Sequence, residues 1–439
     1  MPKKTKKEIK DERLKSALAD EDSDSYDEQS DVSTSTMARH ATMEQLATEL
    51  SEGIENLTEK AAAKRLEGLT TICKIMKLRY IIEILGGQLE SLINGAIQCC
   101  AKSTSAEETI LAFNLFTLIS TTIGGCSSAN DQRNLFGSKS LNTSKSASVI
   151  LTEDNSLRMK EVLTRHADAA TKKKSEVRCE ALFSLSVLEF MDCSPEDLIL
   201  EKENNKLDVF KQYWNDQDEQ VASTAIEGWS LLATMIPNKY KVSILVPSSL
   251  KLLSSIIASE TKSSSEKIAA GQAVALLFDA INNMEDSSIA QVEYDNLVTA
   301  MNKVASISTK SVSKKERATQ RMNFRNFVNT VEDGDCPVEE MNVSGNVLLF
   351  ENWDRLVQLV NFKRVLEGGI LEHFKFNSNL QLAFGVDGMD LSVEKQASKL
   401  DSMQKKFYLS KNSDFNKNDT LEKNKLTRQF SNYVQTEED

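Results

Sequence analysis

The fold is constrained most by a helical pattern that recurs along the middle of the chain. Three segments open with a polar residue and an acid, continue with a branched aliphatic residue and small residues, and then become strongly apolar; they span 175–185, 218–229 and 265–276. Their branched aliphatic residues, Val177, Val221 and Ile268, lie 44 and 47 positions apart. This period is typical of helix-pair repeats of the HEAT or armadillo kind.

Spacing within the segments predicts that these helices stack. The first segment places apolar residues at i, i+4, i+8 and i+11 of one helical face, namely Val177, Ala181, Leu185 and Leu188, and the second repeats this spacing with Val221, Ala225, Trp229 and Leu232. One helix pair cannot bury its apolar face alone, so pairs stack on one another. We therefore predict an all-α, armadillo/HEAT-like α-solenoid, with Trp229 buried between repeats and a close helix contact at Gly271. Independent helices in an ordinary bundle are the alternative.

The repeats are expected to occupy residues 41–305. An earlier copy begins near Ile110, 67 positions before Val177, and the excess predicts a loop insertion over about 126–148, which is rich in Ser, Asn and Lys. A weaker copy lies near Ala61. The chain has only 5 prolines and 16 glycines in 439 residues, which favours long helices over many short strands.

Residues 1–40 predict a disordered, charged tail. Five lysines fall in the first ten positions, and residues 20–31 carry seven acids, so this segment cannot bury enough apolar surface to fold. The lysines are either a solvated run or a nuclear-import signal. The apolar runs are too short to cross a bilayer, which predicts a soluble protein without a membrane partner. Seven cysteines without C-x-x-C spacing predict reduced thiols in a reducing compartment rather than a disulfide framework.

The search for catalytic and metal motifs predicts a protein that is not an enzyme. The sequence contains no glycine-rich phosphate loop, and its three histidines, His40, His166 and His373, lie far apart without a cluster of cysteines or acids around them. We therefore expect no metal, no cofactor and no small-molecule substrate.

Two basic segments are candidates for binding RNA or another partner. With a net charge of -12, the chain can contact nucleic acid only where its cations are concentrated. The first segment is a helix predicted from Ser313 to Glu332, with a capping box between Ser313 and Glu316. It carries the candidate residues Lys314, Lys315, Arg317, Arg321 and Arg325. The three arginines recur every four residues and form one stripe, opposite a buried face of Phe324, Phe327 and Val331. In the alternative interpretation the arginines pair with acids of the preceding repeat.

The second basic segment lies in the C-terminal tail, residues 391–439. Its candidate residues are Lys405, Lys406, Lys411, Lys417, Lys423, Lys425 and Arg428, interleaved with Phe407, Tyr408, Phe415 and Phe430. Cations with spaced aromatic rings suit RNA, because phosphates take the charge and bases stack on the rings. An amphipathic helix that docks on the solenoid is an equal alternative.

Several blocks in the last third of the chain resemble the interferon-related developmental regulator family. The resemblance covers about Glu266 to Gly385 and rests on the order and spacing of the blocks 267–278, 314–325, 348–353, 365–374 and 379–385. It implies an armadillo-like solenoid followed by a small C-terminal domain, here 306–390 with the basic helix. Asp414, Asp419 and Glu422 interrupt the tail, which is less basic than the family pattern.

The resemblance also implies two activities for a chain without catalytic residues. Members of the family associate with ribosomes that are not translating, and they act as transcriptional co-regulators with histone-deacetylase corepressor complexes. We therefore expect a non-enzymatic regulator in cytoplasm and nucleus that binds ribosomes or ribosomal RNA and modulates translation. A protein scaffold in a nuclear corepressor complex is the alternative.

Overall fold

The structure is a computed structural model, and it describes residues 36–124, 151–171, 173–200, 205–284, 291–306, 314–387, 389 and 391–392. The chain divides into two compact units, residues 1–48 and 49–439. The first helix, α2 (Thr36–Thr58), runs across that division. The predicted tail boundary at residue 40 therefore falls inside a helix that begins at Thr36. The rest of the predicted tail, the predicted loop of 126–148 and nearly all of the predicted 391–439 segment lie outside the described residues.

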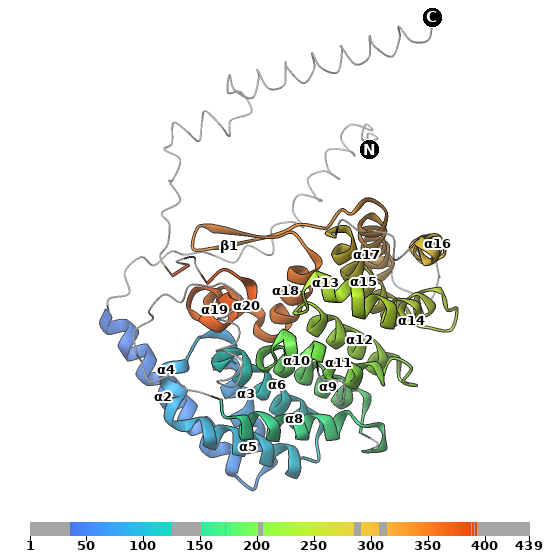
Figure 1. The fold of residues 1–439 in the computed structure, drawn as a ribbon. Coiled ribbons are helices and arrows are strands. Elements are labelled where there is room, and N and C mark those ends of the chain that lie inside the picture. Colours follow the sequence, from blue (N-terminus) through green and yellow to red (C-terminus); the bar gives the residue numbers. More distant parts are fainter. Residues whose placement is uncertain are drawn as a thin grey trace, which may run out of the picture. The chain divides into compact units, whose positions relative to one another are not determined.

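Helices dominate the described part of the chain, as the sequence predicts (Figure 1). After α2 the elements are α3 (Ala62–Leu78), α4 (Ile82–Leu85), η1 (Gly86–Gln88), α5 (Leu89–Lys102), α6 (Ala106–Ile123), α8 (Glu153–Ala167), η3 (Ala169–Thr171), α9 (Ser175–Asp192), α10 (Pro195–Leu200), α11 (Lys206–Lys211), α12 (Glu219–Ala233), α13 (Asn238–Tyr240), η4 (Lys241–Leu245), α14 (Val246–Ala258), α15 (Ser264–Asn282), α16 (Gln291–Ser306) and α17 (Lys314–Asp333). The C-terminal elements are β1 (Glu339–Val343), β2 (Asn346–Phe350), α18 (Trp353–Leu366), η5 (Glu367–Gly369), α19 (Ile370–Phe376) and α20 (Ser378–Phe384).

The longer helices form a series in which each packs against the next. α3 contacts α6, α6 contacts α9, α9 contacts α12, α12 contacts α15, and α15 contacts α17. Most of them also pack against the helix that precedes them in the chain, as α8 packs on α9 and α14 on α15. The segments that share the repeated pattern are α9, α12 and α15. The earlier copies near Ile110 and Ala61 correspond to α6 and α3.

Two of the repeat helices begin where polar side chains satisfy their first backbone N–H groups, whereas α9, preceded by Lys174, has no side-chain cap. Asp218 accepts hydrogen bonds from the backbone N–H groups of Gln220 and Val221 at the start of α12. Ser263 and Glu266 form a capping box at the start of α15, so that helix is capped two residues before the Ser265 of the predicted opening. The capping box predicted between Ser313 and Glu316 lies outside the described side chains.

The apolar faces expected from the repeat spacing are buried in this series. All eight residues of the two aligned stripes, from Val177 to Leu188 and from Val221 to Leu232, lie in the core. Trp229 is fully buried and meets the ring of Trp214 edge to face, with the ring centroids 5.4 Å apart. A Cβ atom placed on Gly271 would lie 2.6 Å from the ring of Phe327 in α17, so the predicted close helix contact is made with the basic helix.

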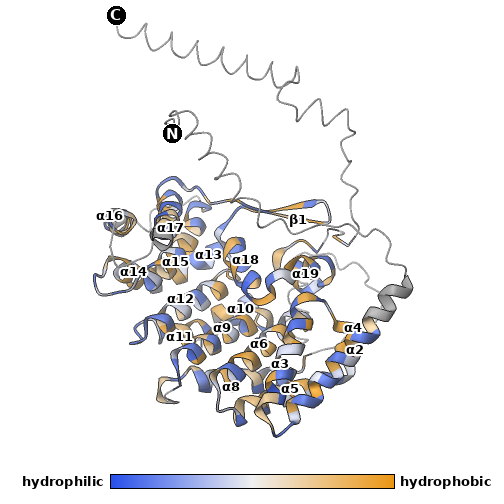
Figure 2. Cartoon of the chain, turned by 180° about the vertical axis from the view of Figure 1, so that it is seen from behind, coloured by the Kyte–Doolittle hydropathy of each residue, from blue (hydrophilic) through white to orange (hydrophobic). Residues whose placement is uncertain are grey.

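The segment from Asn238 to Ala258 combines α13, the π-helical turn η4 and α14. It is long and apolar enough to pass a length and composition test for a membrane span, although half of its most apolar window is buried within the fold. α14 packs against α15 and α16, as a core helix does. Figure 2 shows hydrophilic and hydrophobic residues alternating along the helices. This match is weak support for a membrane span, and the expected solubility stays a prediction.

The C-terminal elements begin with a two-stranded antiparallel hairpin, β1 paired with β2 from Glu339↔Phe350 to Val343↔Asn346. Its turn residues Ser344 and Gly345 both have positive φ, as a type I′ turn requires. The helices α18, α19 and α20 follow and lie on the helix series: α18 contacts α3, α6, α12 and α15, α19 contacts α3, and α20 contacts α6.

Candidate partner-binding surfaces

The basic helix α17 has one buried and one exposed side. Phe324 and Phe327 are buried and pack edge to face at 5.4 Å, and Phe327 also stacks near Trp353 of α18. Arg321 and Arg325 are exposed. No described acid lies within ion-pairing distance of either guanidinium group. The described residues therefore offer no support for the alternative in which the stripe pairs with acids of the preceding repeat.

The remaining candidate residues are less completely placed. Lys314, Lys315 and Arg317 lie in the first turn of α17, but their side chains are outside the described residues. The tail candidates Lys405, Lys406, Lys411, Lys417, Lys423, Lys425 and Arg428 all lie outside the described residues. Their contact with RNA stays a prediction, as does the contact of the α17 stripe.

The sequence did not reveal how the C-terminal helices attach to the helix series. Ion pairs join Lys77 to Glu367 at 2.6 Å and Arg364 to Glu180 at 2.7 Å. The Arg364 guanidinium also lies 3.6 Å from the centre of the Phe183 ring, a cation–π geometry. These contacts tie η5 and α18 to α3 and α9.

Buried hydrogen bonds to backbone carbonyls complete the attachment. The Nε2 atom of His373 lies 3.0 Å from the carbonyl oxygen of Met76, and Asn377 donates to the carbonyl oxygen of Thr121 at 2.8 Å. A carbonyl only accepts, so Nε2 carries the proton of the neutral ring. The other ring nitrogen, Nδ1, faces the Asn377 amide at 3.5 Å. Burial lowers the pKa of His373 to about 4, which keeps the ring neutral at physiological pH.

A buried ion pair joins the other end of α18 to the π-helical turn. The Lys241 ammonium is almost fully buried and lies 2.5 and 2.6 Å from the two carboxylate oxygens of Asp354. Burial raises the pKa of Asp354, and the nearby Lys241 opposes that rise. Gln358, one turn further along α18, donates to the Thr234 hydroxyl at 2.9 Å. The Lys241–Asp354 pair therefore fixes α18 against η4, and Gln358 fixes it against the end of α12.

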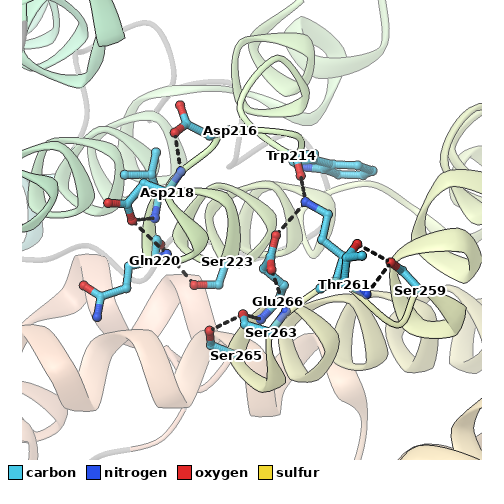
Figure 3. Close-up of polar contacts among 12 residues, drawn as sticks. Trp214, Asp216, Asp218, Gln220, Ser223, Ser259, Thr261, Ser263, Ser265 and Glu266 are labelled. Atoms are coloured by element: carbon cyan, nitrogen blue, oxygen red, sulfur yellow. Dashed lines mark hydrogen bonds and ion pairs between the residues drawn. The ribbon is translucent and has the colours of Figure 1, made fainter.

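A polar pocket of about 620 Å³ lies where α9, α12 and α15 begin (Figure 3). Its acids are already engaged in holding the helices. Asp218 caps α12 and accepts a hydrogen bond from Ser175, and Glu266 caps α15 and pairs with Lys262 at 2.6 Å. A hydrogen bond from Arg178 lowers the pKa of Asp216. These carboxylates cap helices and form ion pairs. Their arrangement is therefore that of structural groups rather than of a catalytic pair.

The described part of the chain contains no group of three potential metal ligands. The six described cysteines are free thiols, and burial raises the pKa of Cys73 and Cys336 to about 12 and that of Cys99 to about 11. Thiols with such pKa values are protonated at neutral pH and are poor nucleophiles.

Comparison with known proteins decides the family. The sequence profile of the interferon-related developmental regulators matches residues 16–332, well over half of the chain. The chain belongs to the interferon-related developmental regulator family. The matched range includes the repeats, where the sequence had shown only a general helical likeness. The blocks after residue 332, on which the resemblance partly rested, lie beyond it.

Individual relatives match over shorter stretches. Interferon-related developmental regulator 2 of Mus musculus is 32% identical over 162 residues, which cover 37% of this chain and 36% of that protein. Interferon-related developmental regulator 1 of Mus musculus is 26% identical over 184 residues, or 40% of each chain. Each match therefore spans less than half the length of the relative. A crystal structure of an engineered protein aligns with a TM-score of 0.37 at 15% identity, covering 64% of this chain and 97% of that one, which is too weak a likeness to define a shared fold.

The features that sequence reasoning missed belong to the C-terminal attachment. The sequence marks His373 only as a candidate metal ligand, and it gives no sign that Lys241 pairs with Asp354. A partial signal existed, since a lysine in an apolar stretch and an Asn four residues after a His suggest buried partners. Their partners, however, are far away in the sequence or are backbone carbonyls.

Proposed function

We propose that this family member is a non-enzymatic regulator that binds ribosomes through RNA phosphates and so modulates translation. The observation that carries the proposal is the exposed side of α17, where Arg321 and Arg325 stand one turn apart, without a described acid partner, while Phe324 and Phe327 anchor the opposite side. Guanidinium groups that are not paired within the protein are available for phosphate oxygens. A surface of this kind binds RNA without sequence preference.

The proposal includes an armadillo/HEAT-like scaffold that holds α17 in place. Its support is the series of helix contacts from α3 to α17 and the burial of the repeated apolar stripes. α17 ends this series and is fixed by Gly271 and by Trp353, whose indole N–H donates to the Thr330 hydroxyl at 2.8 Å. A rigidly held helix presents its arginines at a constant spacing.

The alternative function, a protein scaffold in a nuclear corepressor complex, requires an open surface on the helix series. In this structure α18, α19 and α20 cover the C-terminal ends of α3, α6 and α12. A partner that used that surface would have to displace them. This observation favours α17 as the surface that contacts the partner. The experiment below can instead support the scaffold function.

The test replaces Arg317, Arg321 and Arg325 together by glutamate and measures co-sedimentation of the full chain with purified ribosomes over a range of salt concentrations. The matched control replaces the exposed lysines Lys74, Lys102 and Lys239 by glutamate, which changes the net charge equally. We expect the arginine variant to fold normally, because Arg and Glu are both good helix formers and the described guanidinium groups make no internal ion pairs. We also expect it to lose ribosome binding and to show a shallower salt dependence of any residual binding.

The control variant should bind nearly as the unmodified protein does. Two results would contradict the proposal. Equal loss in both variants would show that only net charge matters, and unchanged binding in the arginine variant would exclude α17 and point to the tail from Lys405 to Arg428 or to a protein partner.

A further inference from the structure

The β1–β2 hairpin has one face packed on the core and one face turned outward. Residues on its inner face, including Val343, Leu348 and Phe350, are buried, and the Phe350 ring packs 5.7 Å from that of Phe384. The hairpin is therefore held firmly from one side. Side chains alternate along a strand, so the opposite face is turned away from the core.

That outward face is apolar and acidic. Val338, Val347 and Leu349 are 58%, 56% and 52% exposed. Glu340, opposite Leu349 in the register, is also exposed on this face, and the exposed Glu351 follows directly after β2. This face carries no basic residue. An apolar strip flanked by two exposed carboxylates attracts a partner that is both apolar and cationic. The same carboxylates repel the phosphates of RNA.

The backbone of the hairpin is open at its edges. Its two-residue turn makes Val343 and Asn346 a hydrogen-bonded pair, so pairing alternates from there and the N–H and C=O groups of Val347 and Leu349 point away from β1. In the part of the chain that the structure describes, no backbone group outside the hairpin bonds to them.

The β2 edge is the better candidate for pairing with a further strand. The α19 helix packs against β1, and Glu339 of β1 is ion-paired with Lys363 of α18. In both views the hairpin lies at the margin of the helices (Figures 1 and 2). An unpaired edge of this kind is a template for a further strand.

We propose that the β2 edge binds an extended, basic peptide segment of a partner protein, which adds as a third strand to the hairpin. The main chain of the peptide would pair with the outward N–H and C=O groups of Val347 and Leu349. Its apolar side chains would lie beside those two residues, and its lysines or arginines would face Glu340 and Glu351. This surface is separate from the arginines of α17 and selects the opposite charge.

The test measures fluorescence anisotropy of a labelled peptide titrated with the full chain. In this lysine peptide every second residue, the set that shares one face of an extended strand, is alternately valine and lysine, and threonine stands between them. Two further peptides separate the contributions: one with glutamate in place of every lysine, and the lysine peptide with alternate backbone nitrogens methylated. We expect saturable binding of the lysine peptide that weakens with salt, no binding of the glutamate peptide, and about tenfold weaker binding of the methylated peptide, as the loss of one or two edge hydrogen bonds predicts.

Variants of the hairpin locate the binding site. Val347→Pro removes one outward N–H and no bond of the β1–β2 ladder, and Val347→Thr keeps that N–H as its matched control. The proline variant should bind the lysine peptide about tenfold more weakly than the threonine variant does. Glu340→Gln with Glu351→Gln should remove most of the salt dependence.

Three results would overturn the proposal. One is equal binding of the lysine and glutamate peptides. Another is full binding of the methylated peptide, which remains decisive even if Val347→Pro disturbs the hairpin. The third is a chain that dimerises in solution through this edge, shown by light scattering and abolished by Val347→Pro, which would make a second copy the occupant.

Discussion

Replacing Gly369 by alanine tests the attachment of the C-terminal helices most sharply. A Cβ atom on Gly369 would press against the Lys77 carbonyl oxygen and lie 2.7 Å from its carbonyl carbon and 2.8 Å from the Leu78 Cα. These are backbone atoms at the end of α3, so no side chain can rotate away to make room. Overpacking of this kind costs about 1–3 kcal/mol, and a clash with backbone belongs at the upper end of that range.

Gly368 provides a control one residue away, because a Cβ atom there would meet nothing within 4 Å. Neither glycine has a positive φ, so alanine at 368 should be neutral or stabilise the protein by about 0.4–1 kcal/mol. Urea unfolding of both variants measures the difference, and hydrogen exchange at the end of α3 locates it. If both variants unfold at the same urea concentration, η5 does not pack on α3 as described.

Three further predictions concern the core and pH. Trp229→Ala should cost about 3–5 kcal/mol because the ring is fully buried against Trp214, and an unchanged melting temperature would show that this face is wrongly assigned. Gly271→Leu should destabilise the fold by about 1–3 kcal/mol through overlap with the Phe327 ring, whereas tolerance of leucine in thermal melts would argue against the close contact of α15 and α17. The folded pKa of His373, about 4, lies below its unfolded value, so the unfolded chain takes up the proton first and stability falls as the pH drops from about 6.5 toward 4. Between pH 7 and pH 5 this should remove roughly 2 kcal/mol, and His373→Gln should lose that pH dependence in chemical unfolding.

Helices were predictable from the sequence because their determinants are local. The small residues and apolar spacing of α9 and α12 lie within one segment, as does the Asp218 cap of α12, and stacking follows from repetition of that segment. The exposed side of α17 followed in the same way from the four-residue spacing of Arg321 and Arg325. The start of α15 was misplaced by two residues because Ser263 and Ser265 are equally good caps in isolation.

The C-terminal attachment was not predictable on the same grounds. His373 bonds to a carbonyl 297 positions earlier, and every residue carries a carbonyl, so no sequence pattern marks this partner. Lys241 and Asp354 are oppositely charged, but many such pairs exist in a chain with 53 basic and 65 acidic residues. The hairpin edge was hidden for a different reason: which face of the hairpin stays open depends on where α18 and α19 pack, and no local pattern marks that packing.

Co-sedimentation of the unmodified endogenous protein with ribosomal particles at physiological salt tests the central claim most directly. If α17 presents its arginines to ribosomal RNA, the protein should travel with ribosomal particles through a density gradient and be released as the salt concentration is raised. A protein that stays at the top of the gradient at physiological salt, and is recovered only with protein partners, would contradict the claim.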